Sequence, residues 1–161
     1  MPPRKYALNL NVQINPLLPK HLLMQPFNTF KGRYGQIALY FNEKGRLLLA
    51  QPSGYISPQL LRKELNFLQQ FATQQTRPWR YMVELTEVRF AHLFNPFLLR
   101  RFKRLHQLYS YSAYAPSRLP RFAIKMTAWI NPIDIIIPDK LTFQRTLNGS
   151  FISNDGVLQN E

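Results

Sequence analysis

The feature that most constrains the fold is one long amphipathic helix predicted between two strand-forming segments. Ser57-Pro58 is a strong helix start, because serine caps free backbone N–H groups and proline suits the first helical position. Apolar residues then recur at helical spacing, which predicts a helix from residue 58 to about 74. A single helix between two strands implies a right-handed crossover and parallel pairing of those strands.

The same alternation of strand and helix continues along the chain. Strands are predicted at 34–41, 46–51, 79–85, 109–114 and 133–137, with a hairpin turn at 42–45 and a sharp change of direction at Gly54. Further helices are predicted from 94 to about 108, from 117 to 129 or 130, and over 140–148, where Gly149 ends the last one. This order predicts an α/β fold: a mixed, mostly parallel sheet with an N-terminal β-hairpin and about four helices.

The chain of 161 residues is expected to form one domain with short extensions. Residues 1–33 are interpreted as an N-terminal extension with one alternating strand at 5–14 and an irregular remainder. The folded domain is predicted over 34–149, and 150–161 as a flexible tail.

Charge is the most unusual property of the composition. There are 21 lysines and arginines against 8 acids, a formal net charge of +13. Such an excess favours an anionic partner: an acidic protein, nucleic acid or an anionic membrane. The chain has no cysteine, which excludes disulfides and thiolate chemistry. No apolar run is long enough to span a membrane and the N-terminus is a poor signal peptide, so the expected location is cytoplasmic, or peripheral to a membrane.

The element order over about residues 34–147, with the ELTEVRF stretch at 84–90 after the fourth strand, resembles the STAS domain. This is the fold of bacterial anti-sigma factor antagonists and of the soluble tails of sulfate transporters. The APS run at 115–117 and the WINP run at 129–132 also resemble small STAS/SEC14-type proteins. The resemblance implies this fold and a tendency to bind proteins.

The family's regulatory serine or threonine would fall at the start of the helix after that strand. Here those positions read HLFN at 92–95, without a hydroxyl group. A phosphorylation switch is therefore not expected at this place. Thr86 is a substitute acceptor, but it lies earlier in the chain.

Few residues are left for catalysis. The three histidines are not at metal-ligand spacing, and there is no nucleophile motif or glycine-rich phosphate loop. Glu84, Glu87 and His92 could converge as an acid–base set where strands end. The alternative, a loop whose polar groups bond its own backbone, is favoured. We therefore expect a non-enzymatic protein without catalytic residues, cofactor or metal.

The basic residues of two consecutive helices are the stronger functional signal, because no acid interrupts them. They are Arg100, Arg101, Lys103, Arg104, Arg118, Arg121 and Lys125. Tyr109, Tyr111 and Tyr114 lie between them in sequence, and basic and aromatic groups together suit phosphate contact and base stacking. The other interpretation is that the aromatic residues belong to the core and the charges to a solvated helix face.

The second of these helices has two interpretations. Phe122, Met126 and Trp129 or Ile130 opposite its basic residues are typical of a helix that lies on an anionic membrane. Packing of these residues on the sheet is favoured instead, because the fold needs a helix to cover its core. The sequence thus predicts a STAS-like domain that docks an acidic protein partner or complex through a basic helical face. Nucleic-acid binding through the same face and peripheral binding of anionic membranes or lipids are the alternatives.

Overall fold

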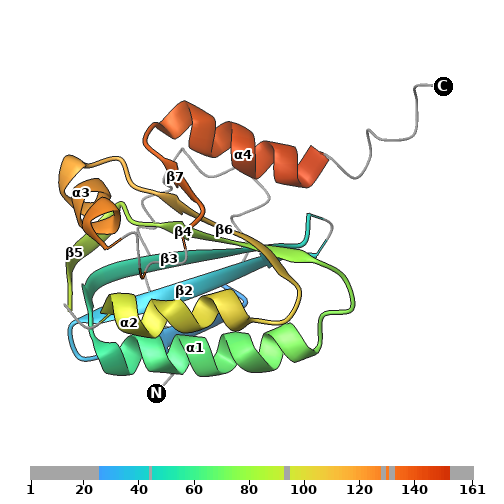
Figure 1. Cartoon of the computed structure of the whole chain (residues 1–161), viewed down its shortest axis with the longest axis horizontal. Helices are drawn as coiled ribbons and strands as arrows, with labels where there is room; N and C mark the ends of the chain where they lie inside the picture. Colours follow the sequence, from blue (N-terminus) through green and yellow to red (C-terminus); the bar gives the residue numbers. More distant parts are fainter. Residues whose placement is uncertain (1–25, 44, 93–94, 128–129, 131–132, 153–161) are drawn as a thin grey trace, which may run out of the picture.

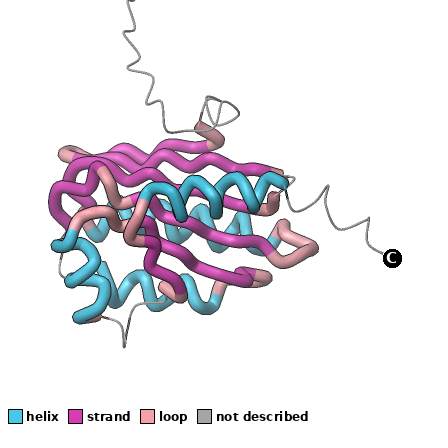
Figure 2. Tube along the Cα trace, turned by 90° about the horizontal axis from the view of Figure 1, so that it is seen from above, coloured by secondary structure: helices cyan, strands magenta, loops and turns pink. Residues whose placement is uncertain are grey.

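The computed structural model describes residues 26–152 except 44, 93–94, 128–129 and 131–132, and of 148–152 the backbone alone. A twisted sheet forms the middle layer (Figure 1). Helices α1 and α2 lie along one face of the sheet, α4 lies across the other, and α3 lies at one end (Figures 1 and 2). The predicted mixed, mostly parallel α/β fold is confirmed.

The strands are β1 Asn28–Lys31, β2 Gly35–Asn42, β3 Leu47–Ile56, β4 Trp79–Glu84, β5 Glu87–Ala91, β6 Leu108–Tyr114 and β7 Ile135–Ile137. The helices are α1 Pro58–Thr73, α2 Asn95–Leu99, the 3-10 helix η2 Arg100–Arg104, α3 Arg118–Met126 and α4 Lys140–Ile152. Within this part of the chain, no helix is both long and apolar enough to cross a bilayer.

The order of strands opens the sheet at one place. It runs β1-β2-β3-β4-β6-β7, antiparallel up to β3 and parallel from β3 onward, and β5 pairs with β3 off this path. The first half of β3 pairs with β4 and its second half with β5, so β4 and β5 follow one another along the same neighbour. The register of β6 on β4 stops at Glu84 with Tyr114. The sheet therefore separates beyond β4, at the carboxyl ends of its parallel strands.

Each face of the sheet has its own core, because successive side chains of a strand point to opposite faces. Tyr81 and Val83 of β4 belong to the cluster beneath α1, whereas Met82 belongs to the cluster beneath α4. On the α4 side, Tyr114 and Phe143 stack with ring centroids 4.3 Å apart. Both helical layers are thus anchored by buried residues of the central strands.

Two strands were not expected. β5 falls in a predicted loop and β1 in the segment predicted to be irregular. β5 alternates charged and apolar residues over only five positions, and β1 has four. Such short edge segments acquire their structure by pairing with β3 and β2, which the local sequence does not reveal. The strand predicted at 5–14 and the tail beyond 152 lie outside the described residues.

Three helices end elsewhere than predicted. Helix α3 ends at Met126 and not at 129 or 130. The helix expected from 94 to about 108 is a short α2 that tightens into η2 and ends at Arg104, because Leu105 is extended and Leu108 already belongs to β6. The backbone of α4 continues through Gly149 to Ile152, so Gly149 does not end it.

A sharp change of direction was predicted at Gly54, and this prediction is wrong. Gly54 lies inside β3 with φ +72°. It pairs with Gly35 of β2. A Cβ atom on Gly35 would lie 2.2 Å from the carbonyl oxygen of Tyr55. The two glycines therefore allow a close approach of β2 and β3.

Candidate functional site

A cavity of about 580 Å³ opens where the sheet separates. It lies between β3, β4 and β5, helix α1, the start of α2, and α3, and most of its lining side chains are apolar. The ends of parallel strands are where α/β sheets commonly bind ligands. We call this the strand-end cavity. Its volume lies within the range of roughly 300–1,000 Å³ that is usual for small-molecule sites.

Glu64 of α1 is the unusual residue in the wall of the strand-end cavity. Its side chain is only 3% exposed, and its carboxylate accepts a hydrogen bond from the hydroxyl of Tyr81. Burial raises the pKa of the Glu64 carboxyl from 4.5 to about 7, against the opposing effect of that hydrogen bond. The site therefore holds a carboxyl group that exchanges its proton near neutral pH.

Sequence analysis did not single out Glu64, although a signal exists. Glu64 follows Leu61 by three residues and precedes Leu68 by four, so it lies in the apolar stripe of α1. An acid in such a stripe is buried with the core. That position marks a carboxyl group with an altered pKa.

An aromatic cluster surrounds this carboxyl group. The ring centroids of Tyr81 and Tyr111 are 4.9 Å apart, and Phe102 of η2 lies 5.5 Å from Tyr81 and 5.4 Å from Tyr111. Burial, followed by the charge of Glu64, raises the pKa of both tyrosines well above the ordinary value. Both hydroxyl groups therefore stay protonated and neutral beside Glu64.

Asn95, the first residue of α2, closes another part of the wall. It is 5% exposed, and its Nδ2 donates to the carbonyl of Ile56 at 2.8 Å. Among the residues that the structure describes, none donates to its Oδ1. Asn95 and His92 both line the strand-end cavity, so the segment where the family switch was sought borders a cavity.

The hypothetical acid–base set is not assembled. Glu84 accepts hydrogen bonds from Gln51 at 2.7 Å and from Thr86 at 3.1 Å. Its charge, and that of Glu87, act on Tyr40, which packs against the core on the α4 side. His92 lines the strand-end cavity on the other side of the sheet. Within the described ranges there is also no group of three His, Asp or Glu residues that could hold a metal ion.

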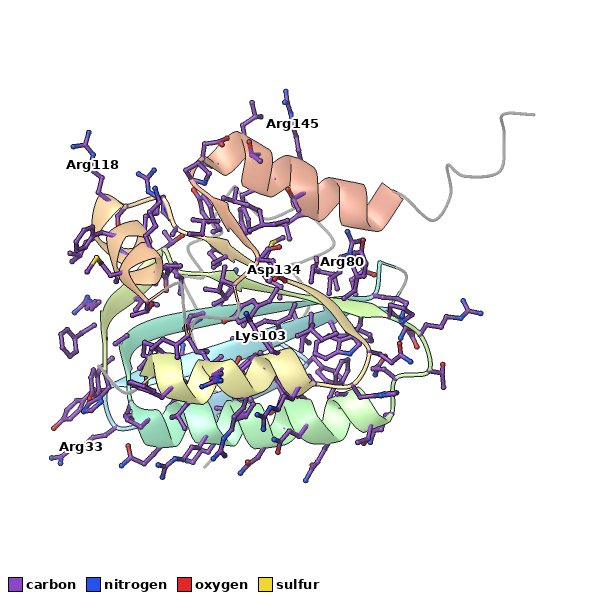
Figure 3. The ribbon with its side chains drawn as sticks, viewed as in Figure 1. Arg33, Arg80, Lys103, Arg118, Asp134 and Arg145 are labelled. Carbon is purple, nitrogen blue, oxygen red and sulfur yellow. The ribbon has the colours of Figure 1, made fainter. Side chains whose placement is uncertain are left out.

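The predicted basic residues occupy two separate elements. Arg100, Arg101, Lys103 and Arg104 lie on η2 and are exposed. Arg118 and Lys125 on α3 are also exposed, whereas Arg121 is half-buried and donates to the carbonyls of Ser117 and Pro116, both at 3.2 Å. In Figure 3, Arg118 points outward from α3, and Lys103 lies on the helical layer next to α1.

Helix α3 does not pack as predicted. Leu119, Phe122 and Met126 are 76%, 62% and 62% exposed. The helix is anchored by Ile124, and Ile130 beyond it is buried as expected. The helix has nine residues and lies at the end of the sheet, because α1, α2 and η2 already cover the face that it was expected to cover. Trp129 lies outside the described residues.

The three tyrosines between the basic segments do not form one exposed row. Tyr109 is 77% exposed, whereas Tyr111 and Tyr114 are buried in the cores of opposite faces. The alternation of β6 explains the burial of Tyr111 on one face and Tyr114 on the other. These three tyrosines therefore cannot form one shared surface for base stacking.

No protein-family model matches the sequence, and no protein with a curated description matches it. Among solved structures, the chain is similar to an uncharacterized protein of the DUF3478 family with a SpoIIAA-like fold from Shewanella loihica PV-4. The TM-score is 0.50 at 14% sequence identity, over 70% of this chain and 92% of that chain. At this identity the likeness concerns the fold alone. The SpoIIAA-like fold is that of the anti-sigma factor antagonists, so the STAS resemblance is confirmed as a resemblance of fold.

Proposed function

We propose that the protein is a non-enzymatic binding domain that docks, in the cytoplasm, onto an anionic membrane surface through α3. The observation that carries this proposal is the exposed apolar stripe of α3, formed by Leu119, Phe122 and Met126. A helix of this size normally buries such residues in its own protein. Their exposure beside basic residues is typical of a helix that lies in a membrane interface.

The geometry of α3 supports this orientation. Successive residues of a helix differ by about 100° in direction, so Leu119, Phe122 and Met126 form one stripe and the three basic residues a neighbouring one. Buried Ile124 points toward the core, away from Phe122. The apolar stripe would face the acyl chains, and Arg118 and Lys125 would lie at the level of the anionic headgroups.

The apolar stripe continues onto β5. Phe90 is exposed and lines the strand-end cavity together with Leu119, and exposed Arg89 lies beside it. Apolar and basic side chains thus surround the same cavity opening. A contiguous apolar patch with a polar rim is typical of an interaction site.

An acidic protein partner or complex, the expectation from the sequence, is the second candidate. The exposed basic row of η2 favours it, because charge complementarity brings acidic partners to such surfaces. Nucleic acid has less support, because the burial of Tyr111 and Tyr114 removes two of the groups available for base stacking.

Co-sedimentation with vesicles tests the proposal. We expect binding to vesicles that contain phosphatidylglycerol and not to pure phosphatidylcholine vesicles. Replacing Arg118 and Lys125 by glutamine should weaken binding by about tenfold or more, because each basic group near the surface contributes about 1 kcal/mol. Replacing Leu119 and Phe122 by serine should weaken it similarly, through lost burial of apolar surface.

Matched controls decide which surface is responsible. Arg62 and Lys63 are exposed on α1, and Leu141 is exposed on α4, so the same substitutions there should leave vesicle binding unchanged. Equal binding by the α3 variants and the wild type would contradict the proposal. Loss of binding only after neutralising Arg101 and Lys103 would assign docking to η2 instead.

A further inference from the structure

We propose that the strand-end cavity binds a neutral amphiphile with one alkyl chain, whose hydroxyl end donates a hydrogen bond to Glu64. This site shares Leu119 of its opening with the docking surface of α3, but its buried walls lie elsewhere. Its walls come from eight elements, including α1, whereas docking involves the exposed apolar stripe of α3. The inference goes beyond membrane docking and holds or fails independently of it.

The walls of the cavity specify an apolar body. Ile37, Ile56 and Val83 are among its buried lining residues, and Leu85, Val88 and Ile133 are partly buried around it. Removing apolar surface from water is favourable in proportion to its area, so an alkyl chain is favoured over a polar ligand in this space. Sites of this kind obtain specificity from a few placed polar groups.

Two buried groups of the wall have acceptor capacity left over. The Glu64 carboxylate receives one hydrogen bond from Tyr81, and a carboxylate has capacity for more. Asn95 Oδ1 has no donor among the described residues. The Oδ1 atom is itself buried, so a ligand reaches it only if the start of α2 shifts. A ligand hydroxyl group can supply a further donor to these two acceptors.

The same groups select against an anionic end. Above neutral pH, where Glu64 is ionised, a fatty-acid carboxylate would bring a second negative charge next to it, and like charges in a buried site repel. The lining also contains His92 and Arg89, of which Arg89 is exposed. A neutral hydroxyl end also loses far less hydration energy on burial than a charged end does. The expected ligand class is therefore a fatty alcohol or a related hydroxyl lipid.

Titration calorimetry of the full chain with decanol and with decanoate, without vesicles, tests this inference. We expect the wild type to bind decanol at least about tenfold more tightly than decanoate. Glu64→Leu should weaken decanol binding by about tenfold, because it removes a buried acceptor. Glu64→Gln should stay within about threefold of the wild type, since its amide oxygen still accepts a hydrogen bond.

A second variant locates the ligand without altering the core. Ala123 lies on α3, is exposed and lines the cavity, so Ala123→Trp should fold and obstruct the opening. Its control is Gln69→Trp on the exposed side of α1. Thermal melts establish that each variant is folded, and Ala123→Trp decides the location if Glu64→Leu does not fold.

Three results would overturn the inference: no decanol binding, decanoate binding as tightly as decanol, or decanol binding that survives Ala123→Trp unchanged. Vesicle binding by Glu64→Gln should equal that of the wild type. A failure of the alcohol measurement is thereby separate from a failure of membrane docking.

Discussion

The buried carboxyl group of Glu64 lowers the stability of the folded protein, because it lies in an apolar wall. A buried carboxylate is costly, so the folded chain favours the protonated acid, and its pKa lies near 7 rather than 4.5. The hydrogen bond from Tyr81 reduces this cost and does not remove it. A leucine at this position would continue the stripe of α1 with an apolar group. An acid at this position is expected where its carboxyl group binds a ligand.

The altered pKa predicts how stability depends on pH. Because the folded pKa of Glu64 is raised, its contribution is fully present below pH 4.5 and is lost as pH rises through 7. The shift corresponds to about 3 kcal/mol over this window. Glu64→Gln removes this dependence, so the difference in unfolding free energy between wild type and variant should change by that order. Tyr81 and Tyr111, which face the carboxyl, stay neutral throughout.

Urea unfolding at several pH values between 4.5 and 8 measures this difference, because other titrating groups cancel between the two proteins. Gln69→Leu, at an exposed and uncharged position of α1, serves as the control and should give a constant difference. A pH-independent difference for Glu64→Gln as well would show that Glu64 titrates normally.

At the scale of elements, the β2–β3 pair depends on its two glycines. Gly54 has a positive φ, and a Cβ atom there would lie 2.4 Å from the carbonyl oxygen of Tyr34. Both backbone strain and a steric clash therefore oppose any side chain. Gly54→Ala should destabilise the fold by about 1–3 kcal/mol in urea unfolding.

Gly32 provides the matched control for this substitution. A Cβ atom on Gly32 would meet its neighbours at 3.4 Å or more, close to ordinary contact. Gly32→Ala should change the unfolding free energy by less than about 0.5 kcal/mol. Equal effects at Gly54 and Gly32 would mean that β2 and β3 adjust easily, against the close approach described above.

The elements that the sequence predicts are those whose local pattern and burial agree. Helix α1 has a cap, a proline start and an apolar stripe, and it was predicted to within a residue or two. β5 has a pattern of only five residues and is ordered by its pairing with β3. The apolar residues of α3 have a helical pattern too, yet they are exposed, because a pattern identifies a stripe and not its partner. The strand-end cavity is lined by β5, which was predicted as a loop, and by α3, which was predicted to pack on the sheet. The sequence therefore could not predict this cavity.

At the scale of the whole molecule, the net charge of +13 acts on folding and on docking in opposite ways. Self-repulsion of a strongly charged chain destabilises its compact state, whereas attraction to anionic lipids depends on the same charges. Added salt screens both interactions, with a Debye length of about 10 Å at 0.1 M. Salt should therefore raise the melting temperature and weaken vesicle binding.

Thermal melts and vesicle co-sedimentation at low and moderate sodium chloride check this opposition. If screening of the self-repulsion raises the free energy of unfolding by about 1 kcal/mol, the melting temperature should rise by about 2–4 °C. The double substitution Arg62→Glu and Arg101→Glu lowers the net charge and leaves α3 unchanged. In this variant, salt should raise the melting temperature less than in the wild type. Vesicle binding by the variant should still fall as salt is added. A melting temperature that falls with salt would mean that favourable charge pairs outweigh the repulsion. Vesicle binding that resists salt would place the docking energy in the apolar stripe of α3 alone.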